Sequence, residues 1–352
     1  GAFRSEVMKP CEHGLVHPDP PRTWKLRAAE RLLVLSGGTG TPKLLVGLKE
    51  VLDPRELTVV ANTADDLWIS GNLVSPDLDT VVYTLAGMID RRRWWGIEGD
   101  TFRTHNFLKS LGRRELLALG DLDRSIHIFR SELLREGLSL SEATARLCRA
   151  LKVAGKVVPM TDDPVSTMIS TPEGEIHLQE FWVGRSGRPD VMGVRFRGIE
   201  DALPSLEFLA ALERAAEVGE PILIGPSNPV SSIGPILALR GVRDLLSKKG
   251  CGSERRRRSR VIAISPLVDG RPVSGPAAKF MRAWGFPVTD QGVAEILGCV
   301  DLMVVSPGSD YRGPSVRLDT TMRNEAESLR LAEEIVRIAD EGMEPGIEAE
   351  AV

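Results

Sequence analysis

Residues 32–43 read LLVLSGGTGTPK, and this stretch decides the fold class. An apolar run, Leu32–Leu35, is followed by a glycine-rich turn and then by an amphipathic stretch that extends to Leu52. A second apolar run, Leu57–Ala61, comes next and ends in NTADD. Short apolar runs that alternate with helical stretches are typical of βαβ units on a parallel sheet. We therefore predict an α/β fold with a Rossmann-like, doubly wound and mostly parallel sheet.

The same alternation continues along the chain. Further apolar runs that are rich in β-branched residues predict strands at Val157–Val158, Ile222–Ile224, Val261–Ile264 and Leu302–Val305. Two regions depart from the alternation. Residues 77–152 predict a mostly helical insertion, and residues 165–198, where turn residues separate three apolar stretches, predict a small antiparallel β-meander.

The excess length of a 352-residue chain is best explained by one elaborated domain. We assign residues 31–340 to this domain, together with its insertion and its meander. Residues 1–30 are proline-rich without apolar periodicity and predict a disordered extension, and residues 341–352 predict an acidic tail.

Composition excludes several classes of protein. The net charge of −4 argues against a nucleic-acid binder, so the basic run at residues 253–260 is expected to be a surface loop. No apolar run approaches the ~18 residues of a membrane span, and no secretory signal pattern is present. The cysteines and histidines lack zinc-site spacing, which favours a cytoplasmic protein with reduced thiols. Any metal must then be held by carboxylates, and these suit Mg²⁺.

The ends of the predicted strands are unusually polar. In open parallel sheets, ligands bind beyond the carboxyl ends of the strands. Any one of these loops would pass as an ordinary turn, but six on one edge favour a polar pocket. The six are SGGTG (36–40), NTADD (62–66), PMTDD (159–163), GPSNP (225–229), SPLVDG (265–270) and SPGSD (306–310).

The glycine-rich turn is a candidate phosphate loop. Gly37, Gly38 and Gly40 allow a tight turn with exposed amides, and the helix that follows favours an anion at its N-terminus. Lys43 could add a positive charge. It stands where the third glycine of GxGxxG would be, and the segment is not a Walker A loop either. Taken alone, the turn supports phosphate binding and a plain βα connection equally.

Four aspartates form the candidate metal site. Asp65 and Asp66 end the second strand, while Asp77 and Asp79 follow in SPDLDT. Carboxylates that converge in this way suit Mg²⁺. The second segment is also a good helix start, with Ser75 as N-cap, so both readings stay open. Adjacent residues of an extended chain point in different directions, so we expect only one of Asp65 and Asp66 to be a ligand.

Three further residues admit a functional and a structural interpretation. Asn228, in GPSNPVSSIGPI, can donate and accept hydrogen bonds to a nucleotide, or it can belong to an ordinary turn. Trp68 follows the acidic pair and can stack on a flat ring or pack in the core. His127 is alone on an amphipathic helix, where packing or solvation is the more common role.

In combination, order and spacing, these motifs resemble the 2-phospho-L-lactate transferase family (CofD/FbiA type) of coenzyme F-420 biosynthesis. The resemblance runs from about Leu32 to about Asp310. It is carried by SGGTG, NTADDLWISG, SPDLDTVVYTLAG, GDTF (99–102), LGDLDRSIHIFR, PMTDD, GPSNPVSSIGPI and SPxxxGxxxxGP from Ser265 to Pro276.

The resemblance implies an Mg²⁺-dependent transferase, expected as a homodimer. Such an enzyme joins a phospho-acid from a guanylylated donor to the deazaflavin alcohol Fo, and GMP leaves. The motifs do not discriminate phospholactate, phosphoenolpyruvate and phosphoglycerate donors. The substrates implied are small molecules, with neither nucleic acid nor membrane as a partner.

The resemblance also implies roles for individual residues. Asp65 and Asp79 would hold Mg²⁺, with Asp66 and Asp77 as alternates, and Asp65 and Asp66 are the candidate catalytic residues. The deazaflavin would lie near Asn62, Asp66 and Trp68. The donor nucleotide and its phosphates would contact Gly37, Gly38, Thr39, Gly40, Lys43, Ser227, Asn228 and Ser231.

Two other functions compete with this one. A related family, the gluconeogenesis factors, binds UDP-sugars as regulators and has Gly and Ser after its acidic pair, where this chain has Leu67 and Trp68. A nicotinamide-dependent dehydrogenase would need a third glycine in place of Lys43, and fold analogy alone carries little functional weight. Both differences favour the transferase.

Overall fold

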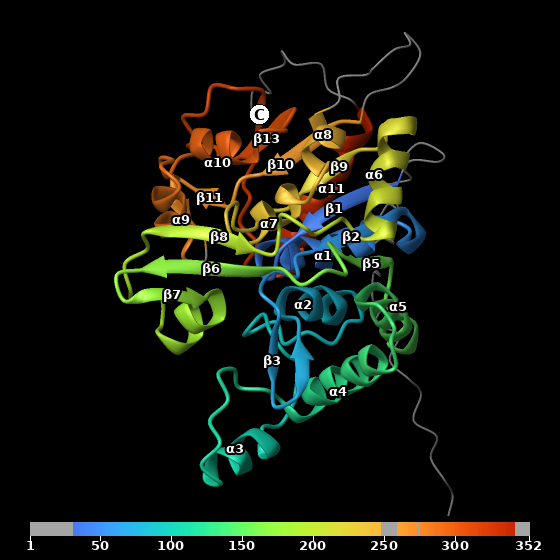
Figure 1. Cartoon of the computed structure of the whole chain (residues 1–352). Coiled ribbons are helices and arrows are strands. Elements are labelled where there is room, and N and C mark those ends of the chain that lie inside the picture. Colours follow the sequence, from blue (N-terminus) through green and yellow to red (C-terminus); the bar gives the residue numbers. More distant parts are fainter. Residues whose placement is uncertain (1–30, 248–258, 274, 342–352) are drawn as a thin grey trace, which may run out of the picture.

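A seven-stranded, wholly parallel sheet forms the centre of the computed structural model (Figure 1). The structure describes residues 31–247, 259–273 and 275–341, so the predicted extension, most of the basic run and the acidic tail lie outside the described residues. In spatial order the strands are β14 (Ser315–Arg317), β13 (Leu302–Val305), β10 (Val261–Ile264), β9 (Ile222–Ile224), β1 (Leu32–Ser36), β2 (Leu57–Ala61) and β5 (Lys156–Pro159). The predicted α/β fold class is confirmed, and the six predicted strands are all present.

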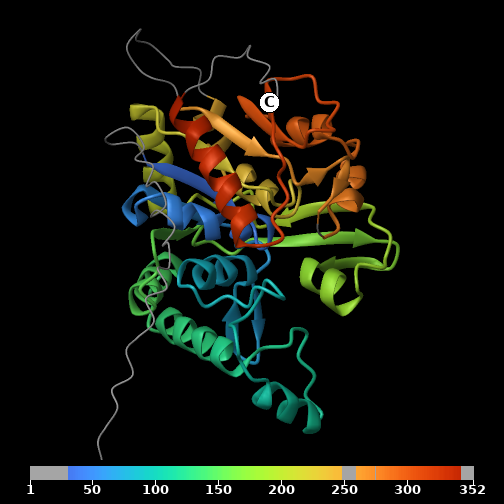
Figure 2. The same ribbon diagram turned by 180° about the vertical axis from the view of Figure 1, so that it is seen from behind.

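Helices cover both faces of the sheet, which explains why its strands are apolar throughout. Leu33 and Leu35 point to one face, while Leu32 and Val34 point to the other. The first face is covered by α6 (Leu206–Val218), α7 (Ile233–Ala238), α8 (Val242–Ser247), α9 (Ala277–Ala283) and α10 (Asp290–Leu297). On the second, α1 (Gly40–Val51) lies beside α11 (Glu325–Glu341), as Figure 2 shows. A short 3-10 turn, Pro54–Glu56, leads into β2.

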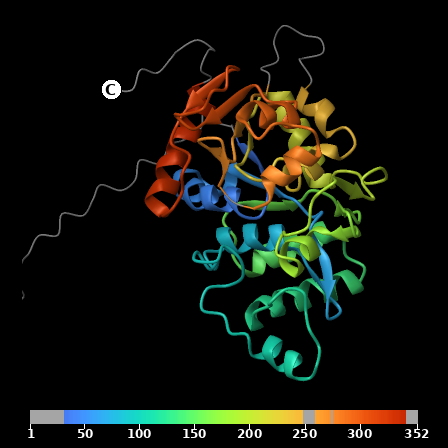
Figure 3. The same cartoon turned by 90° about the vertical axis from the view of Figure 1, so that its left-hand side faces the viewer.

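The chain between β2 and β5 builds a mainly helical region beside the sheet (Figure 3). One of its helices, α2, packs directly against α1, β2 and β5. The hairpin formed by β3 and β4 was not predicted, because its short strands are only partly buried and lack the continuous apolar run, rich in β-branched residues, of the equally short Ile222–Ile224. The elements are β3 (Leu67–Ile69), β4 (Asn72–Val74), α2 (Pro76–Leu85), α3 (Arg103–Ser110), α4 (Asp121–Arg135) and α5 (Leu140–Ala150).

A three-stranded antiparallel sheet is present where residues 165–198 predicted a small antiparallel element. Its strands are β6 (Ser166–Thr171), β7 (Gly174–His177) and β8 (Gly193–Arg197), and their spatial order is β7-β6-β8. The predicted antiparallel pairing is confirmed, and the strand order differs from that of a simple meander only in the place of β8. The apolar stretch after β7 forms a π-helical turn, η2 (Glu180–Gly184), and β8 pairs with the free edge of β6. A second small hairpin joins β11 (Leu267–Val268) and β12 (Arg271–Pro272).

The order of the strands reverses between β1 and β9. From β1 the chain proceeds through β2 and β5 to one edge, and from β9 through β10, β13 and β14 to the other. The loops that follow β1 and β9 therefore leave the sheet in opposite directions, and the crevice between them is where doubly wound sheets bind ligands.

Candidate active site

A cavity of about 510 Å³ opens at this reversal of strand order. The loops after β1 and β9 form one side of it, through Gly38, Thr39 and Gly40 and through Ser227, Asn228, Ser231 and Ser232. Six of these seven residues were predicted for the donor nucleotide, and Ser232 was not. Gly37 belongs to the same loop without lining the cavity.

The two loops are fastened to each other by Ser227. Its Oγ accepts a hydrogen bond from the Gly37 amide at 3.1 Å and lies 2.8 Å from the Thr41 hydroxyl. A side chain on Gly40 would collide with the carbonyl of Pro226, and one on Gly38 would collide with the Asp77 carboxylate. Both glycines are thus required by close approach of neighbouring groups.

Lys43 does not line the main cavity. Its ammonium lies 5.4 Å from the centre of the Trp94 ring, and its side chain borders a separate cavity of about 40 Å³. Partial burial lowers the pKa of Lys43. The geometry therefore favours the exposed amides of the glycine-rich loop, rather than Lys43, as the phosphate contacts.

Four aspartates line the cavity: Asp79 and Asp123 contact His127, and Asp65 and Asp77 form the remaining carboxylate pair. Oδ1 of Asp65 is buried without a hydrogen-bond partner, and Oδ2 of Asp77 accepts a bond from the Asn62 amide at 3.0 Å. Burial, and then the charge of Asp77, raise the pKa of Asp65 well above its usual range. Burial also raises the pKa of Asp77 to about 6. Buried carboxylates that repel each other in this way favour a cation between them.

The two carboxylates fit a magnesium ion whose remaining coordination positions would be filled by the substrate. Within the described residues there is no group of three or more His, Cys, Asp or Glu side chains placed to hold a metal. Mg²⁺ is commonly bound by one or two carboxylates plus substrate phosphates, and the glycine-rich loop lies on the same cavity. Two carboxylates are therefore sufficient here.

Asp66 and Asp79 are occupied by protein partners instead. Oδ1 of Asp66 accepts a hydrogen bond from the Ser75 hydroxyl at 2.6 Å. Both oxygens of Asp79 contact the Arg130 guanidinium, and Oδ2 also lies 3.1 Å from Nε2 of His127. The geometry therefore favours Asp77, the predicted alternate, over Asp79 as the partner of Asp65.

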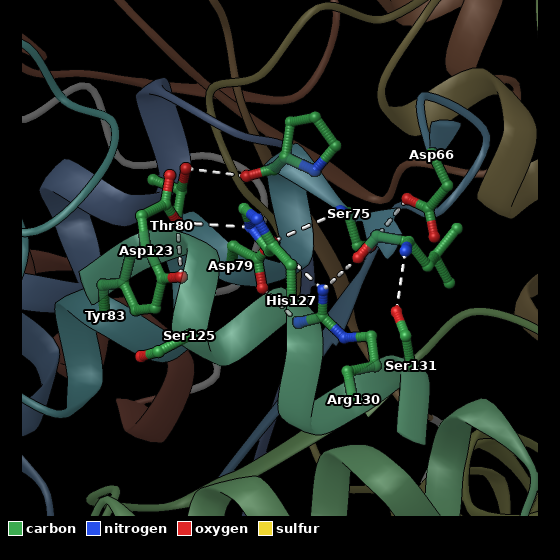
Figure 4. A network of polar contacts seen from close by, with 12 residues as sticks. Asp66, Ser75, Asp79, Thr80, Tyr83, Asp123, Ser125, His127, Arg130 and Ser131 are labelled. Atoms are coloured by element: carbon green, nitrogen blue, oxygen red, sulfur yellow. Dashed lines mark hydrogen bonds and ion pairs between the residues drawn. The ribbon is translucent and has the colours of Figure 1, made fainter. Parts of the chain in front are cut away.

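The contacts of Asp79 belong to a buried network between α2 and α4 (Figure 4). The imidazole of His127 lies between Asp79 and Asp123, 3.2 Å from Oδ1 of the latter. The Tyr83 hydroxyl donates to the same Asp123 oxygen at 2.6 Å. Burial alone would lower the pKa of His127, but its hydrogen bonds to the two carboxylates raise it to about 9. The network stabilises the wall of the cavity that α2 and α4 form.

A family model described as 2-phospho-L-lactate transferase CofD matches residues 32–340. The chain belongs to the 2-phospho-L-lactate transferase family. The transferase of Methanosarcina mazei is 53% identical over 264 residues, which cover 75% of this chain and 82% of the relative. The transferase of Methanopyrus kandleri is 46% identical over 320 residues, which cover 88% of this chain and 98% of the relative. The protein is accordingly a transferase.

Solved structures of a UPF0052 family protein from Bacillus halodurans share the fold. The two are 18% and 19% identical to this chain, with TM-scores of 0.54 and 0.56, and each covers 87% of it and 99% of its own length. At this identity the similarity concerns the fold alone. Among the described residues, no helix is both long and apolar enough to cross a membrane.

The aromatic wall of the transferase cavity differs from the prediction. Trp68 is 59% exposed on β3 and does not line the cavity. Asn62 donates a hydrogen bond to Asp77 and does not line the cavity either. The tryptophans that do line it are Trp94, Trp95 and Trp182. The first two belong to a loop and the third to the π-helical turn. Their only sequence signal was a pair of adjacent tryptophans and a tryptophan in an apolar stretch that resembled a strand.

The raised pKa of His127 predicts a pH dependence of stability for this transferase. Its pKa rises from 6.5 to about 9 on folding, so the stabilisation is complete below pH 6.5 and is lost as the pH rises towards 9. The free energy of unfolding, measured by urea denaturation, should decline over this window. In His127→Gln, which keeps a neutral donor, the decline should be smaller. Equal slopes for both proteins would contradict the assignment.

Proposed function

We propose that this protein transfers a phospho-acid from a guanylylated diphosphate donor to the deazaflavin alcohol Fo, and releases GMP, in coenzyme F-420 biosynthesis. The observation that supports this most is a single cavity that combines three features. These are a glycine-rich loop at a helix N-terminus, a buried carboxylate pair and a wall with three tryptophans. Each suits one part of the reaction: the phosphates, a divalent cation and a flat ring.

The donor is expected to bind at the loops after β1 and β9. The amides of Gly38–Gly40 and the N-terminus of α1 favour phosphate oxygens. Ser227, Asn228 and Ser231 offer donors and acceptors to the nucleotide. Asp65 and Asp77 would hold Mg²⁺. When bound there, the ion would neutralise the charge of the diphosphate.

The acceptor is expected to lie against the aromatic wall, where Trp94, Trp95 and Trp182 offer flat apolar surfaces to the deazaflavin ring. The ribityl hydroxyl oxygen forms a bond to the acid-side phosphorus. The bond between that phosphorus and the bridging oxygen breaks, and GMP leaves with the bonding electrons. The hydroxyl proton passes to a carboxylate of the cavity, for which Asp65 is the candidate because Asp66 does not line it.

We expect the transfer to be direct. Phosphoryl transfer depends mainly on alignment and on neutralisation of charge, and needs little covalent help from the protein. Burial raises the pKa of the Cys148 thiol to about 12 and that of Cys299 to about 11, which disfavours the thiolate that a cysteine nucleophile requires. Neither cysteine lines the cavity.

The UDP-sugar regulator is the weaker candidate. A relative named 2-phospho-L-lactate transferase is 53% identical to this chain over 264 residues, which favours the transferase.

Incubation of the protein with Fo, Mg²⁺ and each guanylylated donor in turn, read by mass spectrometry, tests the proposal. A phospho-acid adduct of Fo together with GMP is the expected product, and the donor that yields it fastest identifies the acid. Absence of an adduct with every donor, combined with tight binding of UDP-N-acetylglucosamine, would establish the regulator instead.

A further inference from the structure

The loop of residues 89–97 is built to hold one conformation. A β-bridge between Ile89 and Ile97 closes it. The Asp90 carboxylate accepts hydrogen bonds from the amides of Arg92, at 2.9 Å, and Arg93, at 3.3 Å. Trp94 has a φ of +58°, a left-handed conformation that is rare for a bulky residue. Such conformations persist where surrounding contacts enforce them, and they cluster at functional sites.

The loop places the Arg93 guanidinium in the wall of the main cavity. Nε of Arg93 donates to Asp90 at 2.8 Å, and the guanidinium lies 4.6 Å from the Trp95 ring and 5.1 Å from the Phe102 ring. The side chain nevertheless remains 32% exposed. Nε and one terminal nitrogen of the guanidinium are thus fixed by the Asp90 carboxylate, each at 2.8 Å, and two aromatic rings lie beside it. This leaves a pre-oriented edge for a ligand.

Arg93 is the basic group of the cavity that is best placed to meet an anion. Along the described part of the chain, the basic side chains that line the cavity are Arg93 and His127. His127 is buried between Asp79 and Asp123, whose charges oppose its own. The contact between Trp94 and Lys43 also joins the 89–97 loop to helix α1, directly after the glycine-rich loop.

We propose that Arg93 determines donor specificity by binding the carboxylate of the acid moiety. This inference rests on the proposed function, because the donor is a guanylylated phospho-acid. The phosphates already have the loop amides and the Asp65–Asp77 cation site. The carboxylate remains, and a guanidinium fork matches its geometry with paired hydrogen bonds.

The test compares two donors with two variants. The donors are the guanylylated phospho-acid that the protein converts fastest and its carboxamide, a neutral analogue of nearly the same shape. Wild-type protein should prefer the carboxylate by about 10- to 100-fold in kcat/KM, the range for hydrogen bonds to charged groups. Arg93→Gln should lose this preference by slowing only the carboxylate donor. Arg93→Lys, which keeps the charge without the fork, should retain part of it. Arg92→Gln is the matched control, because Arg92 is exposed and does not line the cavity.

The results distinguish failure of this inference from failure of the proposed function. If Arg93→Gln keeps the wild-type preference, or slows the conversion of both donors equally, Arg93 does not bind the carboxylate. If both donors are slowed equally and the melting temperature is unchanged, Arg93 binds the phosphates that both donors share. If both are slowed equally and the melting temperature falls, the role of Arg93 is structural. If wild-type protein converts no guanylylated phospho-acid, the proposed function fails first.

Discussion

Replacing Asp77 by Asn is expected to lower kcat/KM for the transfer by about 10²- to 10³-fold. The substitution keeps the size of the side chain and a possible bond to Asn62, but removes one of the two charges that would hold Mg²⁺. Asp65→Asn should behave alike. The measurement is steady-state transfer to Fo over a Mg²⁺ titration. In both variants the half-saturating Mg²⁺ concentration should rise.

Two further variants make this prediction specific. Asp201 is exposed and does not line the cavity, so Asp201→Asn should leave transfer unchanged. Asp66→Asn should lose less activity than Asp65→Asn, because Asp66 is hydrogen-bonded to Ser75 and does not line the cavity. An Asp65→Asn or Asp77→Asn protein with full Mg²⁺-dependent activity would refute the metal assignment.

Replacing Arg130 by Met should destabilise the fold by about 3–5 kcal/mol, the usual cost of leaving a buried charge without its partner. Arg130 is only 1% exposed and contacts both oxygens of Asp79. Burial alone would raise the pKa of Asp79, but the charge of Arg130 and the hydrogen bond of His127 hold it well below its usual range. The free energy of unfolding from guanidinium titrations measures the effect.

The double variant Asp79→Asn/Arg130→Met provides the control. Removing both charges avoids the unpaired carboxylate, so the double variant should be more stable than Arg130→Met alone. Two results would show that the ion pair does not organise the α2–α4 wall. One is a loss of less than about 1 kcal/mol of unfolding free energy in Arg130→Met, and the other is a double variant whose loss equals the sum of the two single losses.

The sheet could be predicted from sequence because its strands are buried on both faces and are therefore apolar at every position. The reversal between β1 and β9 explains why SGGTG and GPSNP, 190 positions apart at Gly37 and Ser227, meet in one site. β14 and the β3–β4 hairpin escaped prediction, because β4 (NLV) and β14 (SVR) mix polar and apolar residues. The equally short β9 (ILI) is a continuous apolar run and was predicted. The order of β6, β7 and β8 depends on the π-helical turn between β7 and β8. An apolar stretch alone does not predict such a turn.

The choice between Asp77 and Asp79 illustrates what the sequence leaves undetermined. Two residues apart on a helix, their side chains point about 200° apart, so only one can easily join Asp65. Which one does so depends on Arg130, which follows Asp79 by 51 positions and binds it. Trp94 and Trp95 line the cavity from a loop in which Trp94 has a positive φ, and no local pattern predicts that conformation.

A single-turnover experiment tests the central claim most directly. Enzyme in excess is mixed with Mg²⁺, Fo and guanylylated 2-phospholactate that is radiolabelled in the acid, and samples are quenched in acid over time. Direct transfer predicts that labelled phospholactyl-Fo and GMP appear together, with equal rates and amplitudes and with no label on the protein. GMP that appears before the product, label trapped on the protein, or no product at any time would contradict it.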